Sequence, residues 1–239
     1  MIRLDKFVSS AGGVSRAQAQ VEIRSGKVTV FGEICKAPEK KVEEGTDIRL
    51  DGQLLFYDKY IYIMMDKPKG YLSATEDTRD PSVTELLLPE HKRRSLGIVG
   101  RLDKDTTGLL ILTDDGELNH RLTSPKYHLD KVYEAELDIE AEESDIGAFA
   151  LGMDFKDFTA MPAKLEIDLS DRRRCRVTIG EGKFHQVKRM FERCGKSVVE
   201  LRRVSMGGLL LDGELRSGGS RLLKPCERDY LLKKCGLKQ

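Results

Sequence analysis

The sequence predicts an α+β protein made of two units: a small helix–helix–strand unit over residues 1–58, and a larger unit over residues 59–239 with a mixed, mainly antiparallel sheet. Two observations support this fold class. Apolar residues near the N-terminus recur at helical spacing, whereas those after residue 59 form short runs or alternate with polar residues, as in strands. The length of 239 residues allows one large domain or two unequal ones.

The first unit is expected to begin with two helices. The first carries apolar residues at i, i+3, i+4 and i+7, which places them on one buried face: Leu4, Phe7, Val8 and Ala11. Gly12-Gly13 ends this helix. Ser15 stands three residues before Gln18, the spacing of a capping box, so a second helix is expected to start there and to end near Gly26. Short strands are predicted around Val28–Val30, Val42 and Ile48–Leu50.

The second unit contains several runs of residues that suit strands. The expected strands are Tyr60–Met65, Gly108–Thr113, Lys131–Leu137, Leu165–Leu169 and Cys175–Ile179, of which the last two can pair as a hairpin. Two short helices are expected, Leu118–Leu122 and Val187–Cys194, the second ended by Gly195.

The composition is that of a globular protein without a metal or a membrane span. No stretch approaches the roughly 20 apolar residues that a span requires, and the segment Met1–Lys6 lacks the apolar stretch of a secretory signal, so we expect a cytoplasmic protein. Five cysteines form no Cys-x-x-Cys pair, and four histidines show no metal-ligand spacing. We therefore expect free thiols and no metal.

The net charge of +1 gives no argument for a nucleic-acid partner, so the local charge distribution must be considered. The segment from Lys183 to Arg203 contains seven basic and two acidic residues. This stretch is either a phosphate-binding surface or a solvated face.

Asp103 is the candidate catalytic residue. It lies in the loop Gly100–Gly108, directly before the expected strand Gly108–Thr113, and the glycines at both ends permit a tight loop. Taken alone, an aspartate in a loop is more often a turn former than a catalyst. The motifs elsewhere in the chain change this interpretation.

Four motifs occur in the order and at about the separations found in the pseudouridine synthases: Lys67-Pro68-Lys69-Gly70, the Asp103 loop, Lys131-Val132-Tyr133, and Glu181–Met190. Over nearly its whole length the chain resembles the branch of that family that modifies ribosomal RNA. In front of these motifs, the segments Arg3–Phe7, Ser15–Ala17 and Ile23–Val28 resemble the RNA-binding module first known from ribosomal protein S-four. The resemblance implies an S-four-like module followed by a catalytic domain of pseudouridine synthase type.

The resemblance implies roles for three residues of the second unit. Asp103 matches the catalytic carboxylate, Tyr133 the tyrosine that stacks on the target base and can take the proton from carbon 5, and Lys188 the basic partner of the carboxylate. Relatives often carry arginine at the last position, and lysine keeps the charge without the bidentate geometry. No cofactor is implied. The residues that match RNA contacts are Arg3, Lys6, Arg16, Arg24 and Lys27 in the first unit, and Arg101, Lys183, His185, Gln186 and Arg189 in the second.

The implied reaction moves uracil from nitrogen 1 to carbon 5 on the same ribose, without water or redox change. A carboxylate beside the glycosidic bond can attack the sugar or base, or it can stabilise positive charge and remove a ribose proton. The sequence leaves both routes open.

Within that branch, the chain looks most like the enzymes that modify 16S rRNA, on the evidence of Asp114-Asp115-Gly116, the run His120–Pro125 and an end soon after the catalytic domain. This resemblance implies 16S rRNA as the substrate, and 23S rRNA is the alternative. A non-catalytic RNA-binding assembly factor would have lost Asp103, Tyr133 or the basic partner, yet all three are present. A retaining glycosidase that uses Asp103 and Asp105 is a weaker alternative, because no sequence motif supports Asp105 as the second acid. The expected partner is ribosomal RNA, free or in a partly assembled small subunit, and the protein is expected to be a monomer.

Overall fold

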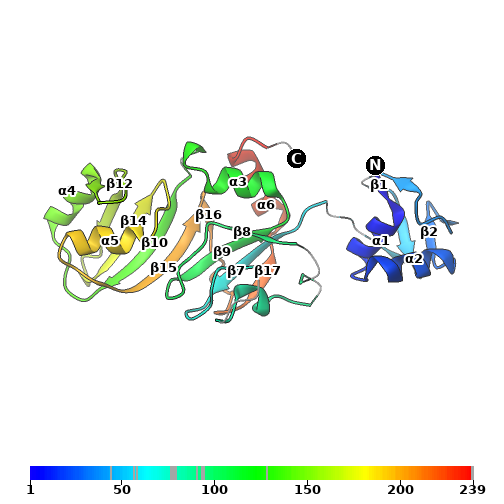
Figure 1. The fold of residues 1–239 in the computed structure, drawn as a ribbon, viewed down its shortest axis with the longest axis horizontal. Helices are drawn as coiled ribbons and strands as arrows, with labels where there is room; N and C mark the ends of the chain where they lie inside the picture. The colour runs from blue at the N-terminus through cyan, green and yellow to red at the C-terminus, as the bar shows by residue number, and fades with distance from the viewer. Residues whose placement is uncertain are drawn as a thin grey trace. The chain divides into compact units, whose positions relative to one another are not determined.

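The computed structural model describes residues 1–43, 45–55, 57, 59–75, 80–89, 91–92, 95–127 and 129–237. The chain forms two compact units, Met1–Tyr60 and Ile61–Gln239 (Figure 1). Both contain helices and sheet, so the predicted α+β class is confirmed.

The first unit packs two helices against short strands. Its helices are α1 (Leu4–Ala11) and α2 (Arg16–Arg24). Its strands are β1 (Ile2–Arg3), β2 (Val28–Val30), β3 (Glu33–Ile34), β4 (Lys41–Val42), β5 (Ile48–Leu50) and β6 (Gln53–Leu54). Four of them form an antiparallel sheet in the order β3-β2-β5-β6, and β1 pairs with β4. The apolar residues predicted to share a helix face, Leu4, Phe7 and Val8, lie in the core of this unit.

The start of α2 is as the sequence predicted. The Ser15 hydroxyl accepts a hydrogen bond from the backbone N–H of Gln18 at 3.2 Å and so satisfies one donor at the helix start. The side chain of Gln18, however, donates to Glu22 one turn further on, instead of returning to the backbone of Ser15 as in a full capping box.

In the described part of the second unit, nine strands form one sheet. They are β7 (Tyr62–Lys67), β8 (Gly97–Val99), β9 (Thr107–Thr113), β10 (Lys131–Leu137), β13 (Lys164–Ile167), β14 (Arg174–Ile179), β15 (Val198–Met206), β16 (Leu209–Leu210) and β17 (Ser220–Leu222). The order is β13-β14-β10-β15-β9-β7-β17, with β16 paired to β15 and β8 to β9. The pairing of β15 with β9 is parallel and the other pairings are antiparallel, as predicted for the sheet as a whole.

Four helices pack around this sheet. They are α3 (Gly116–Thr123), α4 (Glu143–Leu151), α5 (Gln186–Arg193) and α6 (Pro225–Lys234). Helix α4 packs on β13, α5 on β15, α3 on β8 and α6 on β16. Phe149 of α4 and Phe191 of α5 contact each other with ring centroids 4.8 Å apart, in the main core of the unit. Short 3-10 turns at Val83–Leu86 and Pro125–Tyr127 and the small hairpin β11 (Met153–Asp154) and β12 (Thr159–Ala160) complete the unit. None of the described helices is long and apolar enough to cross a membrane.

The basic stretch from Lys183 to Arg203 is neither wholly a phosphate-binding surface nor wholly a solvated face. Arg203 is fully buried in β15, and Lys196 is buried in an ion pair with Asp145, with the Lys196 Nζ 3.0 Å from the carboxylate. These two cations therefore have structural partners inside the protein and are unavailable to RNA.

Candidate active site

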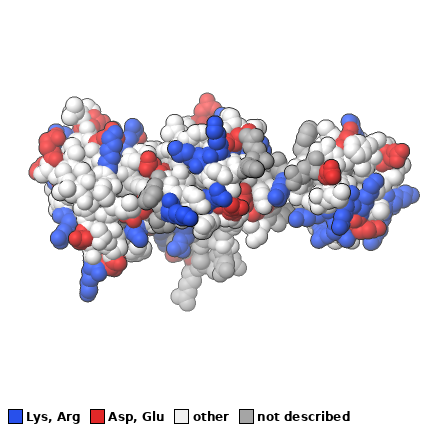
Figure 2. All heavy atoms as spheres, turned by 90° about the horizontal axis from the view of Figure 1, so that it is seen from above, with Lys and Arg blue, Asp and Glu red and all other residues white. Residues whose placement is uncertain are grey.

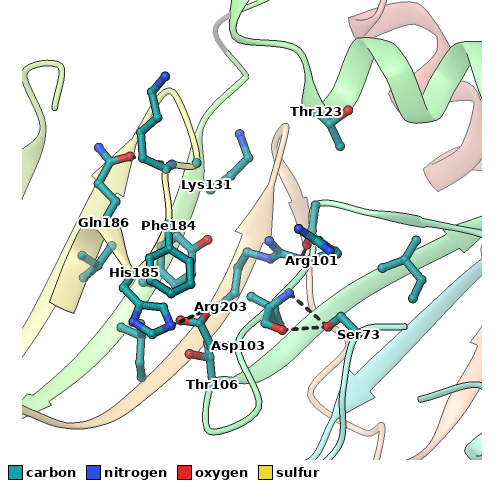
Figure 3. Close-up of a pocket in the computed structure, with 18 of the residues that line it drawn as sticks. Ser73, Arg101, Asp103, Thr106, Thr123, Lys131, Phe184, His185, Gln186 and Arg203 are labelled. Carbon is teal, nitrogen blue, oxygen red and sulfur yellow. Dashed lines mark hydrogen bonds and ion pairs between the residues drawn. The ribbon is translucent and has the colours of Figure 1, made fainter. Parts of the chain in front are cut away.

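Asp103 lies in the loop that joins β8 to β9, and buried groups hold the backbone of this loop in place. The Arg203 guanidinium donates to the carbonyl of Gly100 at 2.7 Å and to that of Leu109 at 2.9 Å. The Ser73 hydroxyl donates to the carbonyl of Leu102 at 2.8 Å and accepts from its N–H at 3.1 Å (Figure 3). Both sides of Asp103 are thus fixed by side chains from other parts of the unit, as a precisely placed catalytic group requires.

Lys67 holds the same loop through hydrogen bonds to its backbone. It is fully buried at the end of β7, and its ammonium donates to the carbonyls of Thr106 at 2.9 Å and Lys104 at 3.3 Å. Burial lowers the pKa of Lys67 to about 8, while the nearby carboxylates of Asp105 and Asp103 raise it. The ammonium therefore carries its charge at neutral pH and adds a positive charge behind the loop.

Gly108 closes the loop where β9 meets β15. Its φ is +101°, and a Cβ added there would lie 2.2 Å from the carbonyl oxygen of Arg203. No side chain fits this close approach of two backbones, so the glycine is required by the parallel pairing of β9 with β15.

We therefore expect Gly108→Ala to lower the free energy of unfolding by on the order of 3 kcal/mol, because the clash is with backbone and the φ is unfavourable for alanine. Chemical denaturation measures this change. Gly116→Ala is the matched control, since an added Cβ there meets no atom of the described residues within 4 Å. A Gly108→Ala protein as stable as the control would contradict the proposed close packing.

The Asp103 carboxylate points into a cleft and lies between two nitrogen-bearing side chains. Its side chain is 30% exposed, and Oδ1 is 3.5 Å from Nε2 of His185 (Figure 3). On the other side, Oδ2 is 3.7 Å from Nζ of Lys188. Lys188 lies closer to a second carboxylate, with its Nζ 2.5 Å from Oδ1 of Asp105. The sequence interpretation paired Lys188 with Asp103 alone, whereas the structure places this cation between two carboxylates of one loop.

Lys188 also affects the ionisation of Asp105. Burial raises the pKa of the Asp105 carboxyl, but effects that lower it prevail, first among them the hydrogen bond and the charge of Lys188, so the pKa lies below its usual value. Lys188 is thus held by Asp105 at a position from which its charge acts on Asp103.

The cleft around Asp103 has a volume of about 750 Å³, within the range of small-molecule sites. Tyr133 of β10 lines it and is only 7% exposed, since β10 is held between β14 and β15. The predicted RNA contacts Arg101 and Lys183 also line the cleft, and both are exposed.

The segment before α5 forms another wall of the cleft. The Gln186 side chain is buried; it accepts a hydrogen bond from the N–H of Lys183 at 3.0 Å and donates to the Glu181 carboxylate at 3.0 Å. Gln186 therefore holds the segment in shape, whereas His185 reaches Asp103. Arg189 is engaged elsewhere: it pairs with Asp157 at 2.9 Å, and it is not among the residues that line the cleft.

The candidate RNA contacts of the first unit differ in their surroundings. Arg3 and Arg16 both contact the carboxylate of Asp5, at 2.9 and 3.1 Å, and the hydrogen bond from Arg3 keeps the pKa of this buried carboxyl well below its usual range. The two arginine side chains remain about half exposed. Lys27 pairs with Glu22 at 2.7 Å. Lys6 and Arg24 are exposed, and Figure 2 shows basic side chains crowded over one part of the surface of this unit.

The sequence interpretation assigned no positioning role to the residues that hold the site in place, namely Lys67, Ser73, Asp105 and Arg203, nor to the anchor Asp5 in the first unit. Lys67 is the first residue of the motif Lys67-Pro68-Lys69-Gly70, but the motif does not show that its ammonium is buried. Within the described residues, no group of three His, Cys, Asp or Glu side chains is placed to hold a metal ion.

Comparisons with known proteins identify the family of the chain. The sequence model of the RNA pseudouridylate synthase family matches residues 61–193, and that of the S4 domain matches residues 2–48. The ribosomal small subunit pseudouridine synthase A of Escherichia coli K12 is 42% identical over 226 residues, which are 93% of this chain and 96% of that protein. An uncharacterized RNA pseudouridine synthase of Bacillus subtilis strain 168 is 41% identical over 93% of this chain and 95% of its own.

A solved structure shares both the fold and much of the sequence. The crystal structure of a pseudouridylate synthase superposes with a TM-score of 0.68 and 38% identity, covering 97% of this chain and 100% of that one. The resemblance found in the motifs is thereby confirmed. The chain belongs to the RNA pseudouridine synthase family and carries an S4 domain in front of its synthase domain.

Proposed function

We propose that the protein isomerises a uridine of 16S rRNA to pseudouridine and that Asp103 is its catalytic carboxylate. The observation that carries the proposal is a partly exposed aspartate, fixed by buried groups and flanked by His185 and Lys188, in the cleft of a pseudouridine synthase domain. Relatives about 40% identical over most of the chain, named for the small ribosomal subunit, support the choice of substrate.

The reaction breaks the bond between nitrogen 1 of uracil and carbon 1′ of ribose and forms one between carbon 5 and carbon 1′. Carbon 5 loses its hydrogen as a proton, and nitrogen 1 gains one, so atoms and electrons balance without a co-reactant. Asp103 acts either by bonding covalently to the substrate or by stabilising positive charge on the ribose and removing a ribose proton. Both routes need a carboxylate held beside the ribose, and the Lys188 ammonium lies 3.7 Å from it.

Tyr133 is the proposed partner of the uracil base. It lines the cleft on a strand that pairs on both sides, which fixes the position of its backbone. An aromatic face suits a base taken out of its stack, and the phenol is the proposed acceptor of the carbon 5 proton. Arg101, exposed at the same cleft, is proposed to contact a phosphate or to occupy the space that the flipped nucleotide leaves.

The test of this function is to map pseudouridine at base resolution in ribosomal RNA from cells with and without the gene. We expect one site in 16S rRNA to disappear and to return when the gene is restored. Loss of a site in 23S rRNA would contradict the substrate, and an unchanged map would contradict the activity. Treating naked 16S rRNA and partly assembled small subunits with the purified protein then shows which of the two it modifies.

The S4 domain is proposed to bind this RNA through the exposed arginines around Asp5. Arg3→Gln together with Arg16→Gln is expected to weaken binding and to reduce the slope of log Kd against log salt by about 1.4 to 1.8, because each phosphate contact contributes about 0.7 to 0.9. Filter binding of 16S rRNA across a salt series measures the slope. Arg176→Gln, which removes an exposed arginine paired with Glu134, is the control. An unchanged slope in the double variant would exclude these two contacts.

A further inference from the structure

Phe184 is a large aromatic side chain that stays exposed at the edge of the catalytic cleft. It is 70% exposed although it lines the same cleft as Asp103. A single exposed aromatic residue is ordinary on a protein surface, so exposure alone decides nothing. Here the ring is also stacked on the imidazole of His185, with centroids 3.8 Å apart and planes inclined by 17° (Figure 3). One face of the Phe184 ring is covered by His185, and the exposed remainder of the side chain is accessible from solvent.

The backbone holds this pair in place before any ligand arrives. His185 has φ 51° and ψ 29°, in the left-handed region that residues other than glycine rarely adopt. Gln186 ties the segment down through its bonds to the N–H of Lys183 and to Glu181, and Glu181 also accepts from the N–H of Met161 at 2.8 Å. Backbone strain held by such surroundings is typical of binding sites.

The position of the stack relative to Asp103 indicates what it contacts. His185 lies 3.5 Å from Asp103, so the stack borders the reacting centre. Tyr133 belongs to the core and is nearly buried, whereas Phe184 is mostly exposed. A uridine that reaches both Asp103 and Tyr133 lies inside the cleft, and the nucleotide next to it in the strand remains at the rim, where Phe184 is.

We propose that Phe184, backed by His185, stacks on the unpaired base next to the uridine that is isomerised. The inference rests on the proposed function and adds a contact to the same site. Bases of single-stranded RNA stack on aromatic side chains whatever their identity. Lys183, exposed and adjacent in the chain, is suitably charged to contact the phosphate beside that base.

The experiment measures tritium release from in vitro transcribed 16S rRNA labelled at carbon 5 of uridine, in single turnover over a range of enzyme concentrations. Phe184→Ala is expected to raise the half-saturating enzyme concentration roughly 10- to 100-fold, as the loss of one base–aromatic stack does. Phe184→Tyr and Phe184→Trp keep an aromatic face and are expected to stay near the wild type. Phe184→Leu keeps apolar bulk without that face and is expected to behave like Phe184→Ala.

The outcomes separate the inference from the function on which it rests. If Phe184→Ala or Phe184→Leu matches the wild type, the stacking contact is overturned. A lower maximal rate at an unchanged half-saturating concentration also overturns it, because Phe184 then acts on Asp103 through His185. Filter binding of the same RNA to the same variants tests the stack without catalysis. If Phe184→Ala weakens binding but the wild-type protein releases no tritium, only the proposed function is contradicted. Thermal unfolding is expected to be unchanged, since the side chain is mostly exposed.

Discussion

Asp103→Asn is expected to lower the rate of pseudouridine formation by roughly 1,000-fold or more, about 4 kcal/mol in the barrier. Asparagine keeps the size of the side chain and a hydrogen-bonding oxygen, but it neither attacks as a carboxylate nor stabilises positive charge on the ribose. Single-turnover tritium release from 16S rRNA labelled at carbon 5 of uridine measures the rate.

Binding and stability are expected to change little in this variant. The Asp103 side chain is partly exposed, and its two nitrogen partners lie at 3.5 and 3.7 Å, too far for short hydrogen bonds that support the fold. The Kd for RNA and the midpoint of thermal unfolding are therefore expected to stay near those of the wild type. Asp105→Asn is the comparison variant: it removes the other carboxylate of the loop and the contact that holds Lys188, and it is expected to lose less activity than Asp103→Asn because the reacting carboxylate remains. A fully active Asp103→Asn enzyme would exclude Asp103 as the catalytic group.

Strands with a simple apolar pattern could be predicted from the sequence, and the central strand β15 could not. The apolar runs of β7 and β9 and the alternation of β10 and β14 mark them as strands. In β15, Glu200, Arg202 and Arg203 interrupt both patterns. Arg203 points inward because the carbonyls of Gly100 and Leu109, distant in sequence, satisfy its guanidinium. A pattern of residue types carries no information about such partners.

The contacts between side chains in the active site were likewise not predictable from residue types. The motifs identified Asp103, Tyr133 and Lys188, and the structure brings all three to one region of the synthase domain. They did not show that Asp105 is the nearer partner of Lys188, because Asp103 and Asp105 are two residues apart in one loop and only the backbone conformation decides which carboxylate the ammonium reaches.

Lys188→Met is expected to slow the reaction roughly 100-fold at saturating enzyme. The variant removes the cation that lies between Asp103 and Asp105, so the two carboxylates of one loop lose the partner that positions them. The loss is smaller than in Asp103→Asn because the reacting carboxylate itself remains.

The adjacent basic residue provides the control. Arg189→Met removes a cation that pairs with Asp157, and the rate of the bound complex is expected to stay within about threefold of the wild type. A larger loss in Arg189→Met than in Lys188→Met would assign the partnership to Arg189.

Lys188→Arg distinguishes charge from geometry at this position. The ammonium of Lys188 is a compact charge that bonds closely to Asp105 and stands 3.7 Å from Asp103, whereas the guanidinium of arginine presents several donors in a fork. If the reaction needs only a positive charge between the two carboxylates, arginine preserves it. Lys188→Arg is then expected to react within about threefold of the wild type, and adding Asp105→Asn to this variant is expected to have little further effect. A loss as large as that of Lys188→Met would show instead that the reaction depends on the single close contact between lysine and Asp105, and the double variant measures that coupling directly.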